Sequence, residues 1–596
     1  MFNAKTIEYQ LQPFSISQHL FKVNVFIPAN QYDSLTFSMP AWIPGSYMVR
    51  DFAKNVCQIQ AKDESGNNLA ICKIDKQTWQ THHQGCAIEI SYLVYAFDPS
   101  VRSAYLNDEY GFINGTSAFI EVKEFSDQPC KVTLLPFKQK AWRVITGMPS
   151  IRVNESGFGS YQALNYAALI DYPILFGEFI DIVFFQDDIE FTMVYTGHPP
   201  IDLERIVKDL KPVLQQQVKL FEDQPPIDKY LFITLLTENG YGGLEHKNST
   251  VLMFSRWDLP ILNDPSEKTK SYRDFLALCS HEFLHTWHVK RTRPKVLLEP
   301  DLSRETYTEQ LWIYEGFTSF YDDLALARSG VITPEQYLEI IGMNITRLLR
   351  NPGRLKQAAA ESSFDAWTRF YQQDANSINH IVSYYTKGGL IALCLDIYIR
   401  ENSSNQYSLD DVMRSLWQQF GKLELGTDDD VIAPILESLT GKCAKALLQT
   451  WVYSPGELPL ATMLRHIGVG YHERHAESFA DTGGKDAAGK MQFSLGINTK
   501  SAETGLVVTQ VREASMACDA DIQVNDKLIA IDGWQVKESN LHRLLSGINE
   551  ATAATIHLLR DGRLVEAQIK AKQVAFDTCF LTIADKDKLN NWLGIA

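Results

Sequence analysis

Residues 281–285 read His281-Glu282-Phe283-Leu284-His285, and this stretch constrains the fold more than any other part of the chain. Side chains four positions apart lie on one face of a helix, so both imidazoles can bind a single metal ion with Glu282 beside them. Zinc accepts imidazole nitrogens, and a catalytic zinc leaves one coordination position open for water. Glu282 is placed to take the proton from that water as it attacks a carbonyl group. The alternative interpretation is a core helix that happens to carry two histidines.

The residues around this motif predict a buried helix from Tyr272 to about Lys290. Apolar side chains lie nearly all round it, which is typical of a helix inside a core. Polar side chains at such positions need a reason, and metal binding provides one. Pro294 ends the segment, because proline disfavours a helical conformation in the residue before it.

A catalytic zinc needs a third protein ligand, and Glu315 is the predicted one. It lies within the apolar and aromatic segment 311–321, where an unpaired carboxylate would be costly. Glu305 and Glu309 compete with it by position. Asp322 shares a helix face with Glu315 and is either a hydrogen-bond partner of a ligand histidine or a solvated charge. The sequence therefore predicts one zinc ion per chain.

Length, charge and cysteine content limit the class of protein. A chain of 596 residues should hold roughly three or four domains. The net charge of −16, without a long basic stretch, argues against nucleic acid or an anionic membrane as a partner. The nine cysteines are scattered and include no CxxC pair, which favours a reducing compartment.

The N-terminus lacks the apolar core of a signal peptide, and no apolar run reaches membrane-spanning length. The best run, from Gly388 to Ile399, is short and interrupted by Asp396. The expected location is the cytoplasm, or the periplasm if a signal peptide has been removed from the chain.

The chain before the metal motif divides into two patterns. Residues 1–185 alternate apolar and polar side chains, as in the stretches 21–27 and 88–94, and this predicts an all-β sandwich-like domain. That domain either positions substrate or serves as a scaffold, and we favour the scaffold. A helical pattern follows over 202–221, and then strands at 230–236 and 250–254.

Between these two strands lies the glycine-rich segment 240–246. Glycines this dense let another backbone, such as a peptide substrate, approach closely, although an ordinary loop is the alternative. Helices continue to about residue 460. Tyr384 and Tyr385 precede an apolar helix, where a tyrosine hydroxyl could donate a hydrogen bond to an oxyanion; an interface aromatic is the alternative.

The sequence predicts a linker over 465–490, a compact module over 491–575 and a tail over 576–596 at the end of the chain. The module contains alternating strands, a helix near 541–548 and a hairpin turn at Asp561-Gly562.

With these segments placed, the chain resembles the glycyl aminopeptidase family of gluzincin metallopeptidases, which carry a C-terminal PDZ domain. Residues 40–51 and 98–115 are similar to the N-terminal β-domain of that family. Residues 281–294 resemble its zinc motif, with His288 where the family more often has Asn, and residues 312–321 resemble its second zinc helix. The resemblance covers nearly the full length and makes Glu315 the third ligand.

Further matches imply roles for other residues. Residues Gly242, Gly243 and Glu245 resemble the motif whose glutamate binds the free α-amine of the substrate. Tyr385 matches the tyrosine that stabilises the tetrahedral intermediate, and so ranks above Tyr384. The module from residue 491 resembles a PDZ fold, which captures extended C-termini by adding a strand to its sheet. Its carboxylate-binding loop is then formed by Leu495, Gly496 and Ile497.

The sequence thus predicts a multidomain α+β protein: an N-terminal β-domain (1–185), a thermolysin-like, mostly α catalytic domain (186–464) and a PDZ-like domain (491–575). The predicted activity is that of a zinc aminopeptidase acting on peptides with a free N-terminus, with small first residues such as Gly or Ala. A peptide C-terminus is a second expected partner, at the PDZ-like module. The alternatives are an endopeptidase with the same metal site, and a PDZ scaffold whose peptidase site is vestigial.

Overall fold

The computed structural model describes residues 6–197, 199–487, 493–548 and 553–595. The chain forms two compact units: Met1–Thr306 with Leu416–Thr427, and Tyr307–Ser415 with Asp428–Ala596. The predicted catalytic domain contributes to both, since the HExxH motif belongs to the first unit and Glu315 to the second.

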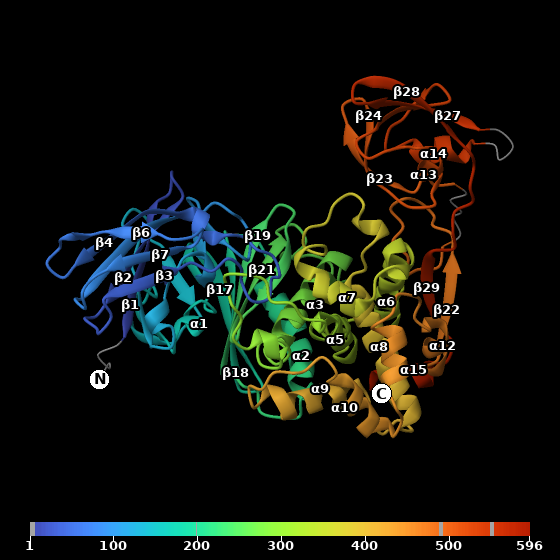
Figure 1. Cartoon of the computed structure of the whole chain (residues 1–596). Helices are drawn as coiled ribbons and strands as arrows, with labels where there is room; N and C mark the ends of the chain where they lie inside the picture. Colours follow the sequence, from blue (N-terminus) through green and yellow to red (C-terminus); the bar gives the residue numbers. More distant parts are fainter. Residues whose placement is uncertain (1–5, 198, 488–492, 549–552, 596) are drawn as a thin grey trace. The chain divides into compact units, whose positions relative to one another are not determined.

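The first unit begins with a β-domain, as predicted (blue in Figure 1). Strands β2 (Leu20–Ile27) and β8 (Ile88–Tyr95) pair antiparallel, and their alternating side chains are buried in one core, because successive residues of a strand face opposite sides of the sheet. The main sheet has the order β14-β15-β12-β1-β2-β8-β4-β5, with strands Ser150–Val153, Gly159–Ala163, Cys130–Leu134, Ile7–Ser15, Leu20–Ile27, Ile88–Tyr95, Val56–Asp63 and Asn68–Leu69.

Two four-stranded sheets complete this domain. The first has the order β13-β16-β10-β9, with strands Arg143–Thr146, Ile174–Gly177, Tyr110–Ile113 and Ala104–Leu106. The second has the order β11-β3-β7-β6, with strands Glu121–Val122, Ser34–Ser38, Thr78–His82 and Ile71–Lys73.

A separate five-stranded sheet carries the glycine-rich segment. Its order is β17-β18-β19-β21-β20, so β20 lies at the edge of the sheet. The predicted domain boundary at residue 185 falls inside β17, which is already part of this sheet. The strands are Phe179–Gln186, Ile189–Thr196, Lys229–Thr237, Ser249–Ser255 and Tyr241–Glu245.

Two helices pack together beside this sheet, α2 (Leu203–Leu220) and α3 (Lys270–Leu284) (Figure 1). Helix α3 contacts β20 and β21 and carries the HExxH motif in its last turn. It ends earlier than the predicted Lys290, with His285 as its C-cap. The chain turns there because the His285 carbonyl accepts the Lys290 N–H at 3.0 Å and the Thr286 carbonyl accepts the Arg291 guanidinium at 2.7 Å.

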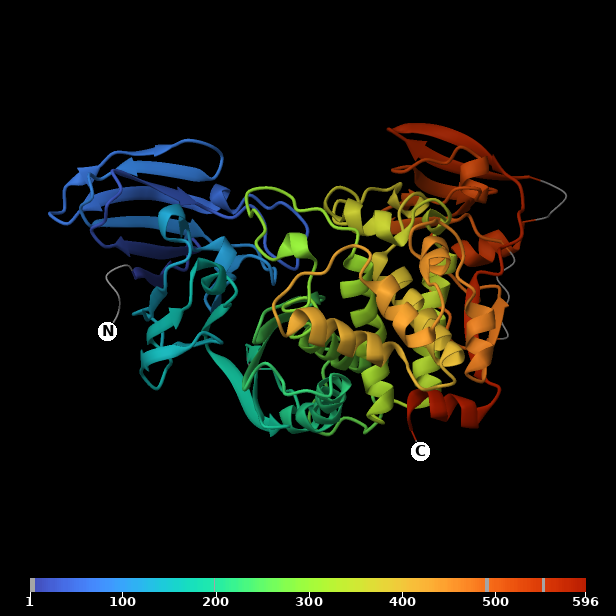
Figure 2. The ribbon, with the colours of Figure 1, turned by 60° about the horizontal axis from the view of Figure 1, so that its bottom comes forward.

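Helices dominate the first part of the second unit (yellow and orange in Figure 2). Helices α5 and α8 approach closely, since a β-carbon added to Gly316 would lie 2.6 Å from the backbone of Gly388. The helices are α4 (Leu311–Tyr314), α5 (Gly316–Arg328), α6 (Pro334–Leu349), α7 (Ala359–Phe364), α8 (Tyr384–Asn402), α9 (Leu409–Leu416), α10 (Ile432–Thr440), α11 (Lys445–Trp451), α12 (Leu460–His466) and α15 (Lys586–Leu593).

The C-terminal module has its own apolar core and a sheet of the order β23-β24-β25-β27-β28, with β26 paired to β25. Asn525 adopts a φ of 72°, and the predicted hairpin turn at Asp561-Gly562 has positive φ at both residues. The elements are β23 (Ile497–Ala502), β24 (Gly505–Val511), α13 (Met516–Asp519), β25 (Lys527–Ile531), β26 (Trp534–Gln535), α14 (Leu541–Ser546), β27 (Ala554–Arg560) and β28 (Arg563–Ile569).

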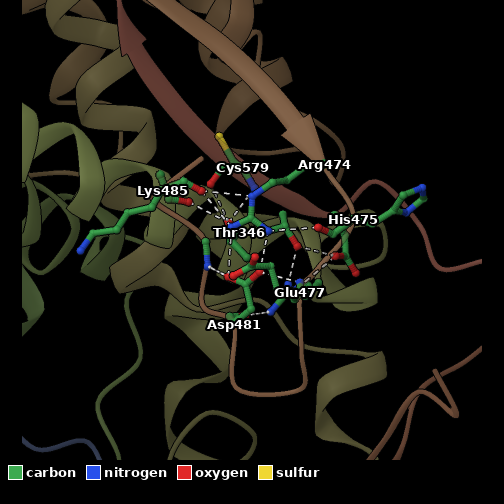
Figure 3. Close-up of polar contacts among 12 residues, drawn as sticks. Thr346, Arg474, His475, Glu477, Asp481, Lys485 and Cys579 are labelled. Carbon is green, nitrogen blue, oxygen red and sulfur yellow. Dashed lines mark hydrogen bonds and ion pairs between the residues drawn. The ribbon is translucent and has the colours of Figure 1, made fainter. Parts of the chain in front are cut away.

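Two paired strands hold both ends of this module, β22 (Val469–Arg474) before it and β29 (Thr578–Ile583) after it. Figure 3 shows contacts within the segment that follows β22: Arg474 forms an ion pair with Asp481 and donates to the Lys485 carbonyl. Thr346 of α6 accepts the Cys579 N–H at 2.8 Å. Parts of the predicted linker and tail therefore have regular structure.

Within the described ranges, no helix is long and apolar enough to cross a membrane. The nine cysteines form no disulfide.

Asp396 explains why the apolar run of α8 contains a carboxylate. Its side chain is 1% exposed and accepts hydrogen bonds from Trp592 Nε1 at 2.6 Å, Arg400 Nε at 3.0 Å and the Leu409 N–H at 2.9 Å. One buried carboxylate thus joins α8 to the start of α9 and to the C-terminal helix α15.

We expect Asp396→Ala to lower the free energy of unfolding by about 3–5 kcal/mol, because it leaves Arg400 and two N–H donors without their acceptor. Trp592→Phe should remove a single charge-assisted hydrogen bond, about 1.5–3 kcal/mol. Urea titration followed by fluorescence and circular dichroism measures both changes. Asp519→Ala, which breaks an exposed ion pair with Lys572, is the control and should change stability by less than about 1 kcal/mol. A loss for Asp396→Ala no larger than the control would contradict this role.

Candidate active site

The two histidines of the motif face each other at the end of α3. Their ring centroids are 4.7 Å apart, and the rings are nearly perpendicular. His285 Nδ1 lies 2.7 Å from the His288 carbonyl. Because a carbonyl can only accept, Nδ1 carries the proton, which leaves Nε2 of His285 as the nitrogen available to a metal ion.

Glu282 lies against the edge strand β20. A β-carbon added to Gly243 would fall 1.9 Å from Glu282 Oε1, so any side chain at this position would displace the Glu282 carboxylate. Thr250 donates from its hydroxyl to Glu282 Oε2 at 3.3 Å, and Tyr230 donates to the Glu282 backbone carbonyl at 3.1 Å. These contacts fix both the carboxylate and the helical turn that carries it.

Glu245 ends strand β20 and forms a cluster with Glu282 and His285. One carboxylate oxygen of Glu245, one of Glu282 and a ring nitrogen of His285 lie within 4.8 Å of one another. Glu245 is 4% exposed, and its Oε1 has no hydrogen-bond partner among the described residues. A buried carboxylate oxygen of this kind is suited to a positively charged group.

The N-terminal β-domain contributes to the walls of this cluster. A β-carbon on Gly45, whose φ is +95°, would lie 2.3 Å from Glu245 Oε1, so the backbone of this loop covers the carboxylate. From another loop, Arg102 Nη2 donates to the Gly243 carbonyl at 3.1 Å. These contacts agree with a scaffold that packs against the five-stranded sheet, and a role of this domain in positioning substrate stays a prediction. Sequence reasoning did not single out these two residues, because no local pattern relates them to β20.

A buried network of ion pairs and hydrogen bonds, centred on Asp171, lies next to the segments that carry Glu245 and His285. Asp171 accepts from Lys290 Nζ at 2.7 Å, from the Lys247 N–H at 2.8 Å and lies 3.3 Å from His246 Nδ1. Burial alone would raise the pKa of Asp171, but the charge of Lys290 and the His246 hydrogen bond hold it well below its usual range. His246 follows Glu245, and the Lys290 N–H bonds the His285 carbonyl, so the network ties the two site segments together.

In the second unit, Glu315 lies at the break between α4 and α5 and is 2% exposed. The predicted burial among apolar side chains is observed, because its neighbours Ile313, Tyr314 and Phe317 are fully buried. A carboxylate is, like imidazole, a ligand type that zinc accepts. The role of Glu315 as a zinc ligand stays a prediction.

Tyr385 lies in the first turn of α8, and its hydroxyl is 3.3 Å from that of Tyr371. Burial, and after it the negative charge of Glu315, raise the pKa of Tyr385 well above its usual range. The hydroxyl is therefore protonated at neutral pH and can donate a hydrogen bond. Asp322 is half-buried on α5 and accepts the Asp323 N–H at 2.6 Å. Its role toward a ligand histidine stays a prediction.

The expected carboxylate loop of the C-terminal module has a defined backbone. Gly496 has a φ of +70°, and a β-carbon there would lie 2.3 Å from Ser515 Cβ. The carbonyls of Leu495 and Gly496 accept the N–H groups of Ala517 and Arg512. Ile497 begins the strand β23. Ligand binding at this loop stays a prediction.

Comparison with known proteins gives consistent matches along the chain. Residues 8–178 match the Peptidase M61 N-terminal domain, residues 274–391 match the M61 glycyl aminopeptidase model, and residues 494–571 match a PDZ domain. No curated protein sequence matches the chain.

Among solved structures, an aminopeptidase N family protein from Idiomarina loihiensis is similar, with 37% identity and a TM-score of 0.96. The alignment covers 99% of this chain and 100% of that one. A mutant M1 zinc metallopeptidase from Deinococcus radiodurans, bound to a Tyr-Ser-Ala substrate, has 12% identity and a TM-score of 0.47, over 77% of this chain and 95% of that one.

We expect Gly243→Ala to lower kcat by about 100-fold, because the new methyl group displaces the Glu282 carboxylate by roughly 1 Å or more. Bound zinc, measured by atomic absorption, should stay at the wild-type level, since the histidines are untouched. Gly547→Ala is the matched control, because its β-carbon would meet no atom closer than 3.4 Å. Wild-type turnover by Gly243→Ala would show that the contact with Glu282 is unimportant.

We expect Asp171→Asn to destabilise the first unit by about 3–5 kcal/mol at pH 7, because Lys290 is then buried without a counter-charge. The pKa of Asp171 is lower in the folded chain than in the unfolded one, so its stabilising contribution is complete above about pH 4 and is lost as the pH falls. Thermal unfolding at pH 7 and pH 3 measures this, and the difference between wild type and variant should shrink at pH 3. Asp274→Asn, which breaks the exposed pair with Lys270, is the control. A difference independent of pH would contradict the charge pairing.

Proposed function

The chain belongs to the M61 glycyl aminopeptidase family, and from this we propose that it removes small N-terminal residues, such as Gly or Ala, from peptides. It is a zinc metallopeptidase, as the family implies. The observation that carries the aminopeptidase assignment is Glu245: a buried carboxylate oxygen without a hydrogen-bond donor, close to Glu282 and His285.

We assign the metal ligands as His281, His285 and Glu315, which hold one zinc ion per chain. Zinc bound there supplies a Lewis acid that polarises the scissile carbonyl and acidifies water. Three features support the assignment: the helical spacing of the histidines, the orientation of His285 by the His288 carbonyl, and the burial of Glu315.

The remaining groups of the site have complementary tasks in peptide hydrolysis. Glu282 takes the proton of the attacking water and then gives it to the leaving amine. Tyr385 donates a hydrogen bond to the oxyanion of the tetrahedral intermediate, since a tyrosine hydroxyl keeps its proton at neutral pH. Glu245 binds the α-ammonium group, and Gly242 and Gly243 let the substrate backbone lie along the edge of the sheet.

The C-terminal module extends this function. We assign the capture of a peptide C-terminus to the loop Leu495, Gly496 and Ile497, beside strand β23, in the manner of PDZ domains. We further infer a reducing location such as the cytoplasm from the scattered cysteines, which include no CxxC pair.

The experiment that tests the aminopeptidase function compares Gly-Ala-Ala with its N-acetylated form. Acetylation removes the charge that Glu245 would bind, so cleavage should fall by at least about 100-fold, and Glu245→Gln should lower kcat/KM for the free peptide by about 10- to 150-fold. Glu282→Gln and a chelator should each abolish turnover. Glu155→Gln, a change of an exposed carboxylate in a turn, is the control.

Equal cleavage of the two peptides would indicate an endopeptidase in which Glu245 is structural. Turnover that survives both Glu282→Gln and the chelator would indicate a scaffold with a vestigial site.

A further inference from the structure

We propose that Arg102 binds the C-terminal carboxylate of the substrate, so that the enzyme prefers peptides of two or three residues with a free acid terminus. This inference rests on the proposed aminopeptidase function and names its substrate class. It follows from the position of Arg102, from its lack of a counter-charge and from the number of β20 residues that separate Gly242 and Gly243 from Glu245.

Arg102 lies at the strand that the substrate must follow. Its Nη2 donates to the Gly243 carbonyl at 3.1 Å, and a β-carbon on Gly242 would lie 3.9 Å from Nη1. Among the described residues, and apart from the chain neighbours of Gly242, no further heavy atom comes within 4 Å of that β-carbon position. Because β20 is the edge of its sheet, the guanidinium borders the place where an added peptide strand would end.

The charge of Arg102 is not used within the described part of the chain. The half-buried side chain forms no ion pair there, and its Nε is buried without a hydrogen-bond partner. A guanidinium has five donors in a planar fork that matches a carboxylate, and its removal from water without a counter-charge is costly. An arriving carboxylate would supply both the missing charge and the missing acceptors.

The loop that carries Arg102 is held in place. Val101 is 2% exposed and packs in the same apolar core as Leu244 of β20. Asn114 donates to the Val101 carbonyl at 3.2 Å, and the Arg102 N–H bonds the Ser100 hydroxyl at 3.2 Å. The position of the guanidinium is thus set by the fold, unlike that of a cation on an exposed loop.

The separation of the two charges sets the substrate length. Glu282 contacts Gly243, so the scissile bond lies near Gly243 and the leaving part of the peptide points toward Gly242. Gly243 and Gly242 are two and three residues from Glu245, which is about 7–10 Å along a strand. An extended peptide of two or three residues spans a similar length of about 7–11 Å. Glu245 and Arg102 can therefore hold the two ends of one short peptide.

The test compares Gly-Ala-Ala with Gly-Ala-Ala-amide, in which the terminal charge is removed while the scissile bond is unchanged. Wild-type kcat/KM should be about 10- to 150-fold higher for the free acid, the range expected for a charge-assisted hydrogen bond. Arg102→Gln should lower the value for the acid by that factor and leave the amide within about threefold of wild type. Arg102→Lys should retain part of the preference, and Arg152→Gln, on the exposed strand β14, is the control.

Equal loss on acid and amide in Arg102→Gln would overturn the inference, because a residue that merely fixes the Gly243 carbonyl affects both substrates alike. A wild-type ratio near one would also overturn it, and this measurement does not depend on the folding of any variant. If the amide is cleaved as well as the acid while N-acetyl-Gly-Ala-Ala is not, the inference fails and the aminopeptidase function stands. If the wild type releases glycine from neither peptide, the proposed function itself fails.

Discussion

The contact between Glu282 and Gly243 is the constraint on which the rest of the site depends. A helix can bring a carboxylate such as that of Glu282, the proposed general base, this close to the backbone of an edge strand only where that strand has no side chain. The same contact sets the distance from Glu282 to Glu245, two residues along β20, and it leaves the open edge of the strand to a peptide. The apolar environment of α3 and the hydrogen bonds from Tyr230 and Thr250 hold the helix in this position.

Much of this arrangement could be predicted from local patterns. The helical spacing of His281 and His285 and the alternation in β2 and β8 depend on neighbours in sequence, and both are found in the structure. The burial of Glu315 followed from the apolar residues beside it. The end of α3 could not be predicted, because it depends on a turn in which Lys290 and Arg291 bond backbone carbonyls instead of continuing the helix.

Contacts between residues that are far apart in the sequence could not be predicted from local sequence patterns. Asp171 pairs with Lys290 across 119 residues and with His246 across 75, and no pattern in the sequence relates these positions. Gly45 and Arg102 reach β20 from loops of the β-domain in the same way. A buried charge needs an opposite charge, but the sequence does not say which of many residues supplies it. The structure shows which residues of the two loops lie beside Glu245 and Gly243.

The strand pair β22–β29 has a consequence for how this architecture can evolve. Arg474 and Thr578 are directly paired, so the C-terminal module begins and ends at neighbouring points of one small sheet. A domain inserted at such a place can be gained, lost or exchanged without changing the path of the chain on either side, because a tight turn could close the same two strands into a hairpin. The helix α15 would still follow β29 and reach Asp396 through Trp592. Evolution can thus add or remove the C-terminal module independently of the peptidase, even though both belong to one continuous chain.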